Sequence, residues 1–192
     1  MDSEIYADVI GSRALADPVT LAPALEAAVT DLNLLFGPTL AAPFAVVHTD
    51  AVQGTLADAV QAPLCVSVLR ELVAPLEVRV GVALGGGGAE EAFVAAWHAD
   101  RLVHYRGVGV AGDLLLNAYC AMVEPLVRGR DAAEWEALRT VRRHPTPAAA
   151  AIELGIGPGE LESRLRAGHW REVEDADATV AAYLALVAGP EA

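Results

Sequence analysis

Apolar and polar positions recur along the first third of the chain with spacings that predict one strand followed by one helix. Residues 4–10 form an apolar run ended by Gly11, which predicts a strand. Apolar residues then recur every three or four positions over residues 19–36, and this stripe ends at Gly37-Pro38, so it predicts a helix. We expect the helix to begin at Asp17-Pro18, because proline is tolerated in the first turn of a helix.

The next segment predicts a hairpin, a second helix and a buried strand. The short apolar run 44–48 predicts a strand, and Thr49-Asp50-Ala51 would turn it into a second short strand, residues 52–56, to form a hairpin. Residues 60–73 return to helical spacing, and the valine-rich run 76–84 predicts a strand buried on both faces. The four glycines at 85–88 predict a flexible loop. The alternative, a phosphate cradle, is disfavoured because no basic residue lies nearby.

A further strand at residues 101–106 and a helix at 112–127 complete this part of the chain. The order strand, helix, strand, strand, helix, strand, followed by this strand and helix, predicts the α+β class. We expect a ferredoxin-like α/β sandwich, in which helices cover one face of an antiparallel or mixed sheet. The polar segment 127–135 predicts a boundary that divides the chain into domains 1–130 and 131–192.

Beyond this boundary the pattern predicts helices alone. Two short helices, residues 147–154 and 158–166, are joined by Gly155-Ile156-Gly157, and a longer helix spans residues 173–187. Two short helices joined by a glycine-containing turn are typical of a helix-turn-helix. We therefore expect residues 131–192 to form a small all-α helix-turn-helix domain.

Composition and charge narrow the class of protein. The chain has 192 residues, of which 54% are hydrophobic, so it is long enough to bury a core. Its net charge is −13, and it contains 13 arginines and no lysine, which excludes a Schiff-base lysine and a lysine-containing P-loop. No run reaches about 18 uninterrupted apolar residues, and the first residues lack a basic and apolar signal pattern. We therefore expect a cytoplasmic protein without a membrane partner.

Charge also indicates where DNA would bind. Residues 139–192 carry six arginines and eight acidic residues, whereas residues 1–138 carry seven arginines and eighteen acidic residues. A DNA contact is therefore expected from the C-terminal part, although Glu160 and Glu162 would face phosphates unfavourably. A repurposed helical packing or dimerisation module is the alternative. The candidate DNA-binding residues are Arg142, Arg143, Ser163, Arg164 and Arg166.

Four segments carry a resemblance to a known family. They are ADVIGSR at residues 7–13, TDAVQG at 49–54, VRVGVALGGG at 78–87 and ELGIGPGELESRLRAGHWREVEDA at 153–176. Together they resemble the SatD family over nearly the whole chain. The family hairpin reads Gly-Asp-Glu-Phe-Gln-Gly, of which Asp50, Gln53 and Gly54 are retained here. The resemblance implies a nucleotide-cyclase-like α/β domain, a helix-turn-helix tail and a stress-linked regulatory role in bacteria.

A more distant resemblance to class III nucleotide cyclases and diguanylate cyclases suggests a metal and nucleotide site. It implies that Asp8 and Asp50 would hold Mg²⁺ and that Asn117 would contact a nucleotide. The cyclase transition-state arginine is replaced by Ala121, and loss of one such donor costs ~3–4 kcal/mol, so cyclase activity is not expected. In the alternative, structural reading, Asp8 caps a turn and Asp50 occupies a hairpin position.

The sequence leaves three functional readings open. The leading one is a non-enzymatic regulatory protein, expected to be a homodimer, that binds DNA through its helix-turn-helix and uses a degenerate cyclase-like domain for dimerisation or ligand sensing. The second is a Mg²⁺-dependent nucleotide-binding or cyclase-like enzyme. The third is a protein–protein interaction module with neither activity. Cys65 and Cys120 are expected to be buried thiols in each case.

Overall fold

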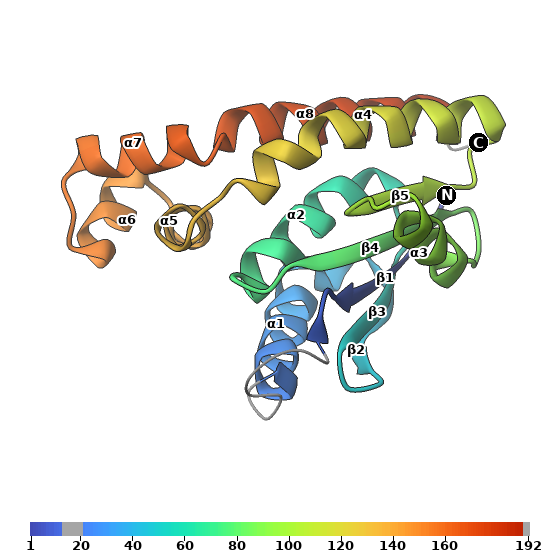
Figure 1. The fold of residues 1–192 in the computed structure, drawn as a ribbon, viewed down its shortest axis with the longest axis horizontal. Coiled ribbons are helices and arrows are strands. Elements are labelled where there is room, and N and C mark those ends of the chain that lie inside the picture. The colour runs from blue at the N-terminus through green and yellow to red at the C-terminus, as the bar shows by residue number, and fades with distance from the viewer. Residues whose placement is uncertain (13–20, 190–192) are drawn as a thin grey trace.

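The chain adopts an α+β fold in the computed structural model, which describes residues 1–12 and 21–189 (Figure 1). The described residues form one five-stranded mixed sheet and eight α-helices. The α+β class predicted from the order of elements is therefore confirmed. Arg13 and the helix start expected at Asp17-Pro18 lie outside the described residues.

The sheet has the strand order β2-β3-β1-β4-β5. Neighbouring strands run antiparallel except β4 and β5, which are parallel. The predicted hairpin is present as β2 and β3, and the valine-rich run forms β4 beside the central strand β1. The strands span Ser3–Val9 (β1), Leu40–Val47 (β2), Ala51–Leu56 (β3), Val78–Leu84 (β4) and Val103–Arg106 (β5).

Helices α1 (Leu21–Phe36) and α2 (Ala62–Val73) cover one face of this sheet. Alternate residues of β1 explain the arrangement, because Ile5, Ala7 and Val9 all belong to the main hydrophobic core that these helices complete. A short 3-10 helix, η4 (Ala59–Gln61), leads into α2, and another, η3 (Gly37–Thr39), leads from α1 to β2.

The opposite face of the sheet is partly covered by α3 (Ala89–His98), a helix that the sequence pattern did not predict. Tyr6 and Ala83 of the sheet form a second apolar cluster with Ala89 and Phe93 of α3. The expectation that helices cover only one face was therefore wrong. Gly81 makes the close approach possible, because a Cβ atom there would lie 2.1 Å from the Ala89 carbonyl oxygen.

Helices α4 (Val110–Arg128) and α8 (Trp170–Ala188) lie side by side along one edge of the molecule (Figure 1). They run antiparallel, because Gly112 near the start of α4 lies beside Tyr183 near the end of α8. Although α8 follows the C-terminal short helices in sequence, Val173, Val180 and Leu184 belong to the main core of the α/β part. Helix α8 thus packs with residues 1–130, although the predicted boundary assigned it to residues 131–192.

Three further helices form a separate unit at the end of the molecule away from the sheet (Figure 1). We call residues 132–167 the three-helix module; it contains α5 (Ala132–Arg143), α6 (Pro147–Leu154) and α7 (Pro158–Ala167). Helix α5 was not predicted. The module has its own apolar cluster, formed by Ala137, Leu138, Val141, Ala150, Ala151, Leu161 and Leu165.

Candidate functional site

Asp8 and Asp50 lie next to each other at one end of the sheet. In the β1–β3 ladder Asp8 is paired with Ala51, and the next residue, Val9, donates its backbone N–H to the Asp50 carbonyl oxygen at 3.0 Å. The antiparallel pairing of a strand end with a hairpin tip therefore places both aspartates together. Their role as metal ligands stays a prediction.

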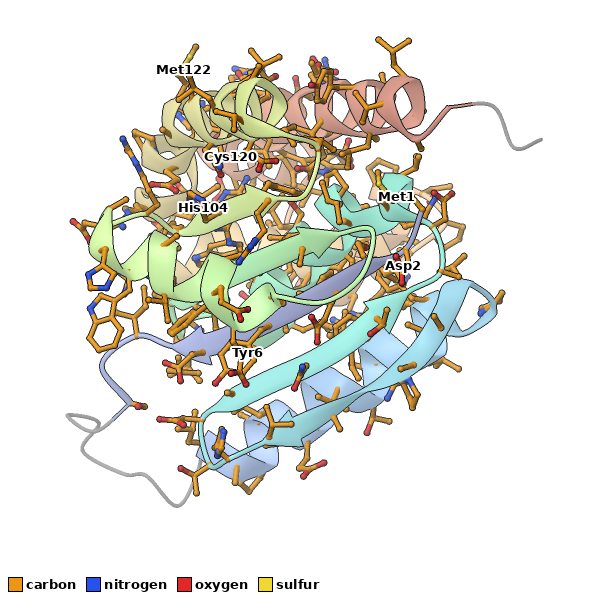
Figure 2. All side chains as sticks on the ribbon, turned by 90° about the vertical axis from the view of Figure 1, so that its right-hand side faces the viewer. Met1, Asp2, Tyr6, His104, Cys120 and Met122 are labelled. Carbon is orange, nitrogen blue, oxygen red and sulfur yellow. The ribbon has the colours of Figure 1, made fainter. Side chains whose placement is uncertain are left out.

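The surroundings of the two aspartates are polar and negative. The hydroxyl of Ser12 donates to Oδ2 of Asp50 at 2.6 Å, which ties the turn after β1 to the hairpin. Burial raises the pKa of Tyr6, and the negative charges of Asp8, Glu90 and Asp50 raise it further. Figure 2 shows Tyr6 on the sheet face that α3 partly covers. The negative charge of these carboxylates would therefore attract a cation to this end of the sheet.

The donor set suits Mg²⁺ better than it suits a triphosphate. Magnesium is commonly held by one or two carboxylates together with phosphate oxygens and waters, so Asp8 and Asp50 would be the protein ligands and the ion would neutralise phosphate charge. The guanidinium of Arg79, which is opposite Asp8 in the ladder, donates to the Arg101 carbonyl oxygen at 2.8 Å and pairs with Asp100 at 3.3 Å. Within residues 1–12 and 21–189, no three metal-ligating side chains come together.

Asn117, the predicted nucleotide contact, holds a strand edge in this structure. Its Oδ1 atom accepts the Tyr105 backbone N–H at 2.7 Å, and its Nδ2 atom donates to the Tyr105 carbonyl oxygen at 2.8 Å. Tyr105 lies on β5, two strands from β1, a separation of roughly 10 Å across the sheet. The fold thus brings Asp8 and Asp50 together but gives Asn117 a separate, structural task.

The four candidate DNA-binding arginines are each paired with a carboxylate. Three of the pairs lie on or beside the three-helix module, and the other joins it to α2. The pairs are Arg142 with Glu71, Arg143 with Glu153, Arg164 with Glu160 and Arg166 with Glu162. Ser163 is exposed on α7, next to Glu162 and Arg164 in the sequence.

The Arg142–Glu71 pair differs from the others because it is buried. Nε of Arg142 donates to Glu71 Oε2 at 2.5 Å and Nη2 donates to Oε1 at 2.8 Å, while the Glu71 side chain is only 5% exposed. Burial opposes the charged form of Arg142, but the bidentate hydrogen bonds and the charge of Glu71 outweigh it, so its pKa is raised. This arginine therefore acts as a structural link between α2 and α5.

A buried polar cluster between α2, α4 and α8 was not found from the sequence. The Ser67 hydroxyl donates to Asp177 Oδ2 at 2.5 Å, and burial raises the pKa of Asp177 to about 6. A cavity of about 40 Å³ beside it is lined by Arg70 and by Glu124, whose Oε1 accepts two backbone N–H groups of the β5 segment. The available signal was the polar pair Arg70-Glu71 within an otherwise apolar helix.

The two cysteines are unsuited to thiol chemistry. Cys65 is buried and Cys120, on α4, is half-buried (Figure 2), and neither forms a disulfide. Burial raises the pKa of both thiols, so little thiolate is present at neutral pH. The expectation of a buried thiol is confirmed for Cys65 and holds in part for Cys120.

Helix α4 has an unusual surface. By length and composition alone it meets the criteria for a membrane-crossing helix, yet only 22% of that stretch is buried inside the protein. Leu116 and Val127 pack in the main core, whereas Val110, Leu114, Leu115 and Met122 are exposed.

Comparison of the chain with models of protein families, with curated proteins and with solved structures gave no match. The interpretation of the site therefore rests on its own residues and geometry.

Proposed function

We propose that this chain is a non-enzymatic bacterial regulatory protein of the SatD type, which contacts DNA through the three-helix module and dimerises through its α/β part. The observation that carries the proposal is the arrangement of α6 and α7. Gly155, in the left-handed conformation at φ 65°, ends α6 and begins a short turn before α7. Two short helices joined by a glycine-containing turn support a helix-turn-helix, in which α7 would be the helix that enters the major groove.

The strand order of the sheet supports the proposal that the α/β part is a ferredoxin-like, cyclase-like domain. Apart from the two 3-10 helices, the chain begins β1, α1, β2, β3, α2, β4, and these four strands form a fully antiparallel order, as expected of a ferredoxin-like core. The nearness of Asp8 to the hairpin tip that carries Asp50 supports the proposed likeness to a cyclase-like metal site. We propose that this domain is a degenerate relative in which the aspartates tie a strand end to a hairpin.

The exposed arginine pairs of α7 are compatible with DNA contact. Surface pairs four residues apart on a helix contribute only ~0.3–0.5 kcal/mol, so Arg164 and Arg166 can exchange their glutamate partners for phosphates. Arg142 cannot, because its departure would leave Glu71 buried and unpaired. In this proposal Arg143, Arg164 and Arg166 are therefore the phosphate contacts.

We expect Arg166→Ala to weaken binding to short duplexes drawn from genomic DNA, since one phosphate contact is lost. The dependence of log K on log salt concentration should become shallower by ~0.9, the contribution of one released counterion. Fluorescence anisotropy over a salt series starting at low ionic strength measures both quantities. Arg101→Ala is the matched control, because Arg101 is exposed on the α/β part. Absence of binding at low salt, or an equal loss with Arg101→Ala, would contradict the DNA role.

Dimerisation is supported by the outward face of α4. Leu114 and Met122 are 71% and 73% exposed, and Figure 2 shows Met122 projecting away from the body of the protein. Val110, Leu115 and Ala118 are exposed on the same face, and residues 114–123 contain no charged side chain. In a chain of net charge −13, a second copy meets little like-charge repulsion on such a face. We therefore assign it to a twofold contact between two copies.

We expect Met122→Glu to raise the dimer dissociation constant by at least about tenfold, because a two-fold contact brings both new carboxylates close together. Sedimentation equilibrium of the full chain measures the change. Ile152→Glu, at an 81% exposed position on α6, is the control and should leave the constant unaltered. A wild-type chain that stays monomeric at high concentration, or that partitions onto lipid vesicles through α4, would overturn the assignment to a second copy.

A further inference from the structure

A pocket of about 250 Å³ lies where the α/β part meets the three-helix module. Its lining includes Arg70, Arg128 and Arg130, together with Trp135 and a single carboxylate side chain, Glu77. Three of the thirteen arginines of a strongly acidic chain thus meet in one place. The excess of positive charge over this pocket contrasts with the negative charge of the protein as a whole.

The arginines of this pocket are only partly satisfied by neighbouring groups. Arg128 approaches Glu77 at 3.8 Å and Asp100 at 3.9 Å, both longer than a charge-assisted hydrogen bond. Nε and Nη2 of Arg70 are buried and have no hydrogen-bond acceptor among the residues that the structure describes. Guanidinium groups in this state favour an added acceptor.

Arg130 is held in place for such an acceptor. Its Nε atom donates to the Gly168 carbonyl oxygen at 2.7 Å, and its guanidinium carbon lies 4.8 Å from the centre of the Trp135 ring. Burial lowers the pKa of Arg130; the negative charge of Glu71 raises it, and the positive charge of Arg70 lowers it. An anion in the pocket would relieve this repulsion.

Carboxylates also face Arg70 from its other side, where the smaller cavity contains Asp177 and Glu124. Glu124 already accepts the backbone N–H groups of Leu102 and Val103, and Asp177 accepts the Ser67 hydroxyl. These groups moderate the charge of Arg70. We therefore assign direct contact with an anion to Arg128 and Arg130, with Arg70 as the third positive charge.

We propose that this pocket binds a phosphate group, carried by inorganic phosphate or by a small phosphate monoester. Arginine pairs with phosphate through two parallel hydrogen bonds, and several guanidiniums together favour a doubly charged anion over a carboxylate. The volume corresponds to about eight waters at ~30 Å³ each, which suits a phosphate with a small substituent. It is below the ~300–1,000 Å³ typical of pockets for larger ligands.

The position of the pocket relates its occupant to both parts of the protein. Arg130 lies between α4 and α5, and Gly168, its acceptor, lies between α7 and α8. A bound phosphate would therefore fix the three-helix module relative to the α/β part. The inference goes beyond the proposed function by adding a class of ligand, and phosphate binding does not require DNA binding.

Isothermal titration calorimetry of the full chain with inorganic phosphate, and separately with glycerol phosphate, tests the inference at constant ionic strength. We expect one site, and Arg128→Gln should weaken binding by about tenfold through the loss of a charged contact. Arg128 is partly exposed, so this variant should fold normally. Arg101→Gln is the matched control and should bind as the wild type does.

Binding of the monoester alone, or of both compounds, supports the site and identifies its source of phosphate. If neither compound binds, the inference is overturned. It is also overturned if Arg128→Gln and Arg101→Gln weaken binding equally. DNA binding is measured separately by anisotropy. A chain that binds phosphate but not DNA would contradict the DNA role alone, and a chain that binds DNA but not phosphate would contradict this inference alone.

Discussion

Gly81→Ala is expected to destabilise the protein by at least about 3 kcal/mol, a large part of the stability of an ordinary domain. The added Cβ would lie 2.1 Å from the Ala89 carbonyl oxygen and 2.3 Å from the Phe93 backbone nitrogen. Both atoms belong to the backbone of α3, so no side chain can rotate away to make room. The helix would have to move off the sheet and leave its apolar contacts with Tyr6 and Ala83.

Urea denaturation followed by circular dichroism measures this loss. Gly159→Ala is the matched control, because no atom lies within 4 Å of the added Cβ and the residue is helical on α7. The control should be neutral or more stable by up to ~1 kcal/mol, since alanine favours helix. Equal stability of Gly81→Ala and the wild type would contradict the close packing of α3 on the sheet.

Arg142→Ala is expected to cost about 3–5 kcal/mol, because it leaves the Glu71 carboxylate buried without its partner. A second variant distinguishes the loss of the pair from the loss of packing. Replacing both residues by methionine removes both charges and retains apolar volume, so its stability should lie close to that of the wild type. Exposed Arg143→Ala is the control, with a change of no more than ~0.5 kcal/mol.

Thermal and urea unfolding of these variants provide the comparison. If Arg142→Ala unfolds within about 1 kcal/mol of the wild type, Glu71 has gained water or another partner, and the pair does not link α2 to α5. A double variant as unstable as Arg142→Ala would instead assign the loss to packing.

The periodicity of the sequence predicted the central part of the fold but missed two helices. Helix α3 buries only Ala89, Ala92 and Ala96, so its apolar stripe consists of small residues that stand out little from an alanine-rich chain. Helix α5 carried a usable signal. The side chain of Asp131 accepts the backbone N–H of Glu134, whose side chain accepts the Asp131 N–H in return, and this capping box is visible as an acid three residues before a glutamate.

The candidate site was predictable only where neighbouring strands determine it. Asp8 and Asp50 are brought together by pairing of a strand end with a hairpin tip, which the order of elements already suggested. The partner of Arg142 is 71 residues away in the sequence, and that of Asp177 is 110 residues away. Such contacts depend on how helices pack, and periodicity carries no information about that.

The return of α8 to the α/β core has a consequence for synthesis on the ribosome. A chain emerges from its N-terminus at about 5–20 residues per second, so the sheet and α2 leave the ribosome well before Val173, Val180 and Leu184. Until α8 follows, the apolar surface that it covers stays open to water. Co-translational folding of the first 130 residues therefore yields an incomplete core, whose closure awaits a segment made some 40 residues later.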